Sequence, residues 1–108
     1  MGNHHCNRPT APDYSQVTQV NLEPEPPPVD YREAMAIANQ EAERLIGQHM
    51  LLSWYDRDRD FESPQHASEC HANSAIPSYV DYALYRGASL RITFEQDRFV
   101  FFYLPIDL

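Results

Sequence analysis

Lysine is absent from the 108 residues of this sequence, and all eight basic side chains are arginines. This absence excludes mechanisms that need a lysine amine, such as Schiff-base formation, a lysine general base or the phosphate-binding lysine of a P-loop. Long apolar runs are also missing, so no membrane span is expected. Cysteine occurs only at Cys6 and Cys70, and no leader-like segment follows Met1. We therefore expect a cytoplasmic protein whose thiols are free or metal-bound rather than joined in a disulfide.

Positively charged residues are also few. Sixteen acidic residues oppose the eight arginines, which gives a formal net charge of −8. A surface with this bias repels a phosphate backbone, so nucleic acid is not an expected partner. An apolar content of 43% and an aromatic content of 12% are typical of a small globular protein, and the length suits one domain.

Proline is unevenly distributed, since six of the nine prolines lie within residues 1–28. The run of residues 23–28, EPEPPP, should be extended because each proline fixes φ and lacks a backbone donor. We predict that residues 1–28 form a tail and proline-rich linker and that residues 29–108 form a single domain. As an alternative within the tail, residues 16–22 have enough β-branched character to add an edge strand.

The first helix is predicted over residues 31–46. Asp30 is a suitable N-cap, Glu33 stands at the capping-box spacing, and Gly47 suits the C-terminal end. Apolar residues recur at spacings of three and four, and several are alanines that allow close approach to a sheet. A strand is expected next, over residues 50–55.

The remaining elements are a short helix and a hairpin. Pro77 and Gly87 bracket the helix, and residues 90–95 and 98–104 alternate as two strands around a turn at residues 96–97. The implied pairs are Phe94 with Phe99, Ile92 with Phe101, Leu90 with Tyr103, Thr93 with Val100, and Glu95 with Arg98 beside the turn. The predicted fold is α+β, with an antiparallel sheet of about three strands packed on two helices that share one face.

One face of this predicted sheet has no cover. It carries Val100, Phe102 and Leu104, and each of these side chains left in water forfeits about 1.5–3 kcal/mol of burial free energy. We therefore expect a second copy of the chain, in a homodimer, or the N-terminal arm to cover this face.

A connection of about twenty residues, 56–75, shows no regular period, and connections of this length are usually functional or disordered. Within it and beside it stand residues suited to bind an acidic or aromatic small molecule. The candidate ligand-binding residues are Trp54, Tyr55, Arg57, Arg59 and His66. A calcium loop at Asp56, Asp58 and Asp60 is excluded, because Phe61 and Ala67 stand where such a loop needs glycine and glutamate.

A second pattern in the same connection suits a metal. Imidazole, carboxylate and thiolate groups within six positions are ligands that zinc or another divalent transition metal accepts. The candidate ligands are His66, Glu69, Cys70 and His71. A nucleophilic Cys70 with a neighbouring histidine as its base is a further possibility, and a polar loop with packed or solvated side chains is the plain alternative.

Several local motifs together resemble a small family of uncharacterised prokaryotic proteins, over about residues 30–105. The motifs are residues 53–56 (SWYD), 62–64 (ESP), His66 with 69–71 (ECH), 79–82 (YVDY), 86–88 (RGA) and 99–102 (FVFF). The resemblance implies an α+β domain without an assigned activity, so it assigns no functional residue.

Two functional hypotheses follow from the sequence. The first is a dimeric binding or accessory protein whose polar loop, residues 56–71, recognises a small ligand or a partner. The second is a small metal- or thiol-dependent enzyme that uses His66, Glu69, Cys70 and His71. The binding hypothesis is favoured because no catalytic spacing in the sequence is specific.

Overall fold

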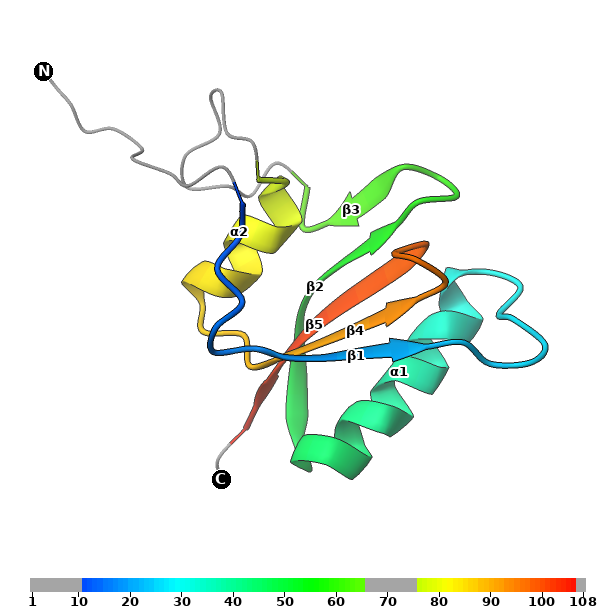
Figure 1. The fold of residues 1–108 in the computed structure, drawn as a ribbon, viewed down its shortest axis with the longest axis horizontal. Coiled ribbons are helices and arrows are strands. Elements are labelled where there is room, and N and C mark those ends of the chain that lie inside the picture. Colours follow the sequence, from blue (N-terminus) through cyan, green and yellow to red (C-terminus); the bar gives the residue numbers. More distant parts are fainter. Residues whose placement is uncertain (1–10, 66–75, 107–108) are drawn as a thin grey trace, which may run out of the picture.

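A computed structural model describes residues 11–65 and 76–106 of the chain (Figure 1). Two helices and five strands alternate along these residues. They are β1 (Thr18–Leu22), α1 (Tyr31–Ile46), β2 (His49–Asp56), β3 (Phe61–Ser63), α2 (Ser78–Tyr85), β4 (Leu90–Phe94) and β5 (Phe99–Pro105). The fold is α+β, as the sequence predicted.

The five strands form one mixed sheet in the order β1-β4-β5-β2-β3. Only β1 and β4 run parallel, and the other neighbours are antiparallel. The prediction of about three antiparallel strands is therefore wrong at both edges. Residues 18–22, placed in the tail with a strand as the alternative, form edge strand β1. At the opposite edge, β3 has only three residues, too few to show a period in the sequence.

The hairpin of β4 and β5 has the predicted register, because Leu90 lies opposite Tyr103 and Phe94 lies opposite Phe99. Its connection, residues 95–98, contains three consecutive non-glycine residues with left-handed φ angles of 48°, 57° and 68°. The Arg98 N–H closes the turn on the Phe94 carbonyl at 2.8 Å. A four-residue turn thus keeps the register that was expected for a two-residue one.

The structure confirms both ends of α1. The Asp30 carboxylate accepts hydrogen bonds from the N–H groups of Arg32 and Glu33, while Glu33 reaches back to the Val29 N–H at 2.9 Å. At the other end Gly47 has a φ of 73° and donates its N–H to a carbonyl of the last turn. The helix is therefore stabilised at both ends by groups that the sequence identifies.

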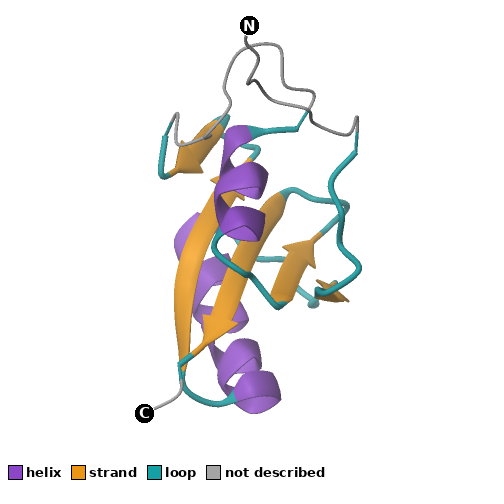
Figure 2. Ribbon diagram, turned by 90° about the vertical axis from the view of Figure 1, so that its left-hand side faces the viewer, coloured by secondary structure: helices purple, strands orange, loops and turns teal. Residues whose placement is uncertain are grey.

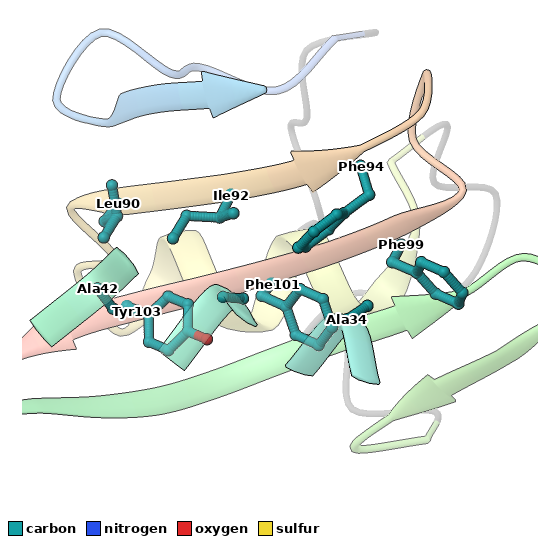
Figure 3. Close-up of a cluster of buried hydrophobic side chains, with 9 residues drawn as sticks. Ala34, Ala42, Leu90, Ile92, Phe94, Phe99, Phe101 and Tyr103 are labelled. Carbon is teal, nitrogen blue, oxygen red and sulfur yellow. The ribbon is translucent and has the colours of Figure 1, made fainter. Parts of the chain in front are cut away.

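The helix α1 covers one face of the sheet with a stripe of alanines. Ala34, Ala38 and Ala42 are fully buried, and their small side chains leave room for the large ones that rise from the strands. These large side chains are Leu90, Ile92 and Phe94 of β4 and Phe99, Phe101 and Tyr103 of β5 (Figure 3). The strands supply most of the volume of this core.

The helix α2 covers the opposite face, so the prediction that both helices share one face is wrong (Figures 1 and 2). Val100 and Phe102 are fully buried against Tyr79, Val80 and Ala83. The sequence of β5 explains this arrangement, because its residues are apolar on both faces. Such a continuous apolar run is typical of a strand that is covered on both faces. The second face therefore has a cover within the chain at Val100 and Phe102, while Leu104 stays only partly buried. The main observation on which the expected homodimer rested no longer holds.

Neither helix in the described part of the chain is long and apolar enough to cross a membrane.

Candidate functional site

The connection in which the sequence analysis placed the site begins as a hairpin. β3 pairs antiparallel with the end of β2, with Asp56 opposite Phe61. The Asp58 N–H donates to the Asp56 carboxylate at 3.0 Å, and Asp60 adopts a φ of 49°, a left-handed angle that aspartate tolerates better than most residues. Residues 56–63 are thus a short hairpin, not the start of an irregular loop.

A β-bulge decides which way the side chains of β2 point. The register against β5 shifts by one residue between Leu51 and Ser53. As a result Leu52 and Ser53 both face α2, Trp54 faces α1, and Tyr55 faces α2 again. The predicted ligand-binding residues Trp54 and Tyr55 are consecutive in the strand and so lie on opposite faces of the sheet.

On the α1 face, Trp54 is part of an aromatic cluster. Its ring stacks on Tyr31 at 5.2 Å between centroids and lies 5.4 Å from Phe61. The Arg59 guanidinium lies 4.1 Å from the Tyr31 centroid and donates to the buried Asp56 carboxylate at 2.7 Å. Arg59 therefore packs onto groups of its own chain by cation–π and ionic contacts.

Of the other predicted site residues, only Arg57 lies among the described residues, and it makes a different contact. Arg57 donates to the backbone carbonyl of Gln96 at 3.0 Å, in the turn of the neighbouring hairpin. His66 lies outside the described residues, and so do Glu69, Cys70 and His71. Among residues 11–65 and 76–106, no three histidine, cysteine or acidic side chains are grouped so that they could hold a metal ion.

On the α2 face lies a pocket of about 360 Å³, lined by Tyr55, Asp60, Glu62 and Gln65. We call it the hairpin pocket. The Tyr55 hydroxyl donates to the Asp60 carboxylate at 2.8 Å, and this hydrogen bond, with some desolvation, raises the pKa of Tyr55. The bond stabilises the protonated form of the phenol.

The wall behind the hairpin pocket is held in place by α2. The Tyr79 ring stacks on Tyr55 at 5.2 Å with an interplanar angle of 11°. Ser78 donates its hydroxyl to the Glu62 carboxylate at 2.6 Å, and the buried Ser53 hydroxyl donates to the Tyr79 carbonyl at 2.7 Å. These contacts fix the aromatic wall and one carboxylate relative to the sheet.

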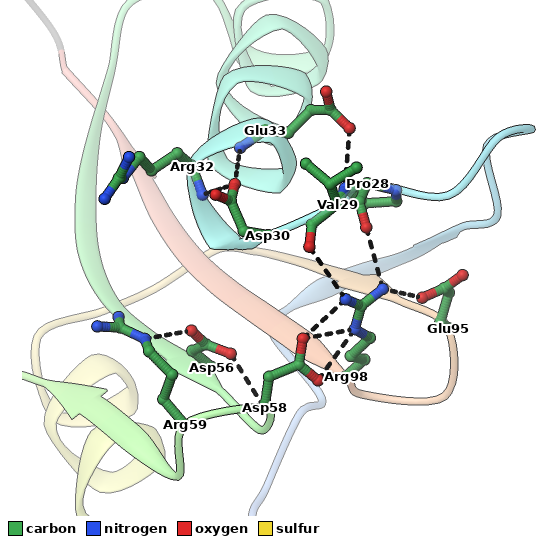
Figure 4. Close-up of polar contacts among 10 residues, drawn as sticks. All are labelled: Pro28, Val29, Asp30, Arg32, Glu33, Asp56, Asp58, Arg59, Glu95 and Arg98. Carbon is green, nitrogen blue, oxygen red and sulfur yellow. Dashed lines mark hydrogen bonds and ion pairs between the residues drawn. The ribbon is translucent and has the colours of Figure 1, made fainter.

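A second polar cluster centres on Arg98, beside the N-terminus of α1 (Figure 4). Its guanidinium donates to the carboxylates of Asp58 and Glu95, each at 2.7 Å at the shortest, and to the carbonyls of Pro28 and Val29. The bond from Arg98 lowers the pKa of Asp58, and both carboxylates raise the pKa of Arg98. One side chain therefore connects two hairpin turns with the segment that leads into α1.

Sequence reasoning missed several of these residues. It expected Arg98 to pair with Glu95 beside the turn, which is confirmed, but nothing in the sequence indicated Asp58 as a further partner. The sequence also gave no signal for Ser78 or Gln65 in a site. A weak signal existed for Tyr79, whose ring belongs to the tyrosine-rich second helix.

Comparisons with known proteins show the family and support the fold. A family model described as a domain of unknown function (DUF5619) matches residues 17–103. The crystal structure of AF1514 from Archeoglobus fulgidus DSM 4304 is similar to this chain, with a TM-score of 0.66 and 22% sequence identity, and the match covers 84% of this chain and 96% of that one. No curated protein matches significantly. At this identity the structural likeness shows the fold alone.

Proposed function

This chain belongs to the DUF5619 family of domains of unknown function, and we propose that it is a small binding protein that holds a cationic group in the hairpin pocket. The observation that carries the proposal is the pocket itself. Its volume of about 360 Å³ lies within the range of sites for small molecules. It also lies in the segment that the sequence singled out as the site.

The lining of the hairpin pocket favours a cation over an anion. Two carboxylates, Asp60 and Glu62, line it together with the amide of Gln65, and the Tyr55 ring offers an aromatic surface. An amine or guanidinium group is attracted by the carboxylates and gains further stabilisation beside an aromatic ring. The net charge of −8 favours the approach of the same class of ligand.

The arginines do not support the acidic ligand that the sequence analysis considered. Arg59 is engaged with Asp56 and stacked over Tyr31, while Arg57 donates to the Gln96 carbonyl. Neither lines the hairpin pocket. An acidic ligand would have to displace these contacts, and in the hairpin pocket it would meet the negative charges of Asp60 and Glu62.

The test is a titration with ethylguanidinium, followed by the amide signals of Tyr55, Asp60 and Gln65 at constant ionic strength. We expect saturable shifts at these positions. Asp60→Asn should weaken binding about tenfold, because it removes the charge and keeps an acceptor for the Tyr55 hydroxyl. Glu41→Gln, which removes one charge on α1, is the matched control and should leave the affinity unchanged.

Benzoate and zinc serve as the comparison arms of this titration. Binding of benzoate at the same signals, without binding of ethylguanidinium, would overturn the proposal in favour of an acidic ligand. Stoichiometric zinc binding that is lost in His66→Ala and His71→Ala, without any response to ethylguanidinium, would overturn it in favour of the metal-dependent alternative.

A further inference from the structure

Among the described residues, nothing pairs with the backbone groups on the outer edge of β1. In the described part of the chain β1 has one neighbour, β4, and lies at the end of the sheet (Figure 1). The Thr18 N–H points toward that neighbour, because it donates to the Ser89 carbonyl at 2.9 Å. Backbone groups alternate in direction along a strand, so the N–H and C=O groups of Gln19 and Asn21 point outward.

The two edges of the sheet differ in how they are protected against pairing. β3 has three residues, contains Glu62 and is followed by Pro64, and short length, charge and proline all discourage strand addition. β1 is longer, with five residues, and has no charge or proline within the strand, although Glu23 and Pro24 follow it. Residues 14–22 contain no charged side chain and no proline, and the pairing with β4 runs without a bulge. This edge has the properties of a strand that accepts a partner.

We infer that a second copy of this chain pairs antiparallel with the outer edge of β1, around a two-fold axis at Val20. In this register the outward groups of Gln19 face those of Asn21 in the partner copy, so each donor meets an acceptor. Registers centred one residue away leave part of these groups unpaired or match them with Val17, whose N–H already bonds to the Tyr14 carbonyl. The result is one sheet that continues across two copies.

The side chains of β1 suit this self-pairing. Val20 lies opposite its own copy, and Thr18 lies opposite Leu22 on the α1 face, where Val20 and Leu22 are only partly buried in a single copy. On the other face the amides of Gln19 and Asn21 meet across the axis. Glu23 falls opposite Val17 rather than opposite another carboxylate, so the pairing brings no acidic residues of the strand into register.

This dimer uses a different surface from the one that the sequence analysis expected, and it does not depend on the hairpin pocket. The pocket lies by β3 at the far edge of the sheet. Two copies that each carry a net charge of −8 repel one another, so salt should strengthen the association. This dependence on salt is opposite to that of an assembly held by ion pairs.

The first test is the wild-type chain, measured by sedimentation at about 100 µM, where contacts of micromolar affinity are nearly saturated. We expect a dimer that is favoured by added sodium chloride. Hydrogen exchange should show protected amides at Gln19 and Asn21, and this protection should be lost on dilution. A monomer at this concentration and at high salt would overturn the inference.

A matched pair of variants tests the backbone contact. Gln19→Pro removes an outward N–H, and proline is tolerated at sheet edges, so we expect a folded monomer. Gln19→Ala also loses the side-chain bond to Arg91, but it keeps the N–H and should remain a dimer. If both variants are dimers, the inference fails. Protection of Gln19 and Asn21 that does not change on dilution would overturn it as well, since the occupant of the edge would then be another segment of the same chain.

Discussion

The two faces of the sheet are covered in different ways. On one face the 16-residue helix α1 contributes buried alanines, and the strands contribute the large side chains. On the other face the 8-residue helix α2 brings its own large residues, Tyr79 and Val80, down onto Val100 and Phe102. The first helix is capped at both ends by recognisable residues, whereas α2 has no side-chain cap at its N-terminus.

The two faces also differ in how many polar side chains they bury. The face under α1 is filled by aromatic and aliphatic side chains along the helix, and its one buried carboxylate among the described residues, Asp56, lies at the end of β2. The face under α2 mixes apolar contacts with buried hydroxyls such as Ser53 and Thr93, and it includes the hairpin pocket. A short helix leaves part of a sheet face for polar groups, and a ligand site can form there without weakening the larger core.

The largest expected effect compares neighbouring residues on the two faces. Phe101→Ala should cost about 3–5 kcal/mol, because the fully buried ring lies between Phe94 and Trp54 and the capped α1 cannot settle into the cavity. Phe102→Ala should cost less, since the shorter α2 can move toward the sheet. Urea unfolding of both variants checks this order. A larger loss for Phe102→Ala would mean that α2 covers the more rigid face.

Sequence reasoning succeeded where a signal is local. Helix α1 was predicted from its caps and its alanine stripe, and the hairpin register from the alternation of residues 90–94 and 99–103. Both rest on interactions between residues close in sequence or joined by a tight turn. The resemblance to an uncharacterised family is likewise confirmed.

The failures concern long-range choices. No local sequence pattern indicates that residues 18–22 pair with β4, about seventy residues later. Likewise, no local pattern indicates that α2 packs on the face of the sheet opposite α1. The bulge at Leu52 cannot be read from the sequence either, yet it decides that Trp54 faces α1 and Tyr55 faces α2. The predicted ligand-binding set also assumed one continuous surface, although Trp54 and Tyr55 are consecutive in a strand and therefore point to opposite faces.

The next effect concerns Arg98, which fastens the start of α1 to the sheet. Arg98→Ala should cost about 1–2 kcal/mol, since two partly exposed ion pairs contribute up to about 1 kcal/mol each and the Pro28 carbonyl loses its donor. Arg44→Ala, which removes one exposed pair on α1, is the control and should leave the free energy of unfolding nearly unchanged. Equal losses in the two variants would show that the network adds nothing beyond a surface ion pair.

A smaller effect tests the N-terminal cap that distinguishes α1 from α2. Asp30→Ala should cost about 1 kcal/mol, because the N–H groups of Arg32 and Glu33 lose their acceptor. Asp30→Asn keeps an acceptor and should cost less. Thermal unfolding of the two variants decides the question, and an alanine variant as stable as the wild type would indicate that Glu33 alone satisfies this end of the helix.

The smallest effect at neutral pH concerns two buried tyrosines, one on each face. Burial raises the pKa of Tyr103 under α1 and of Tyr79 under α2. The Tyr103 hydroxyl also donates to Asn39 at 2.6 Å. A folded-state pKa above the unfolded value of about 10 means that the contribution to stability is intact below that pH and is lost as pH rises above it. The free energy of unfolding should therefore fall between about pH 10 and pH 11.

Replacement of each tyrosine by phenylalanine separates the two faces in this alkaline range. Tyr79→Phe and Tyr103→Phe each remove one titrating group, so each variant should show a shallower fall in urea midpoint than the wild type, measured from pH 8 to pH 11. Absorbance of the tyrosinate form should show that both phenols in the wild type ionise only with unfolding. If one variant retains the full wild-type slope, the tyrosine it replaces reaches solvent before the domain unfolds, and the face that holds it opens first. Of the two faces, the one that holds Tyr79 should open more readily, because α2 has no side-chain cap at its N-terminus.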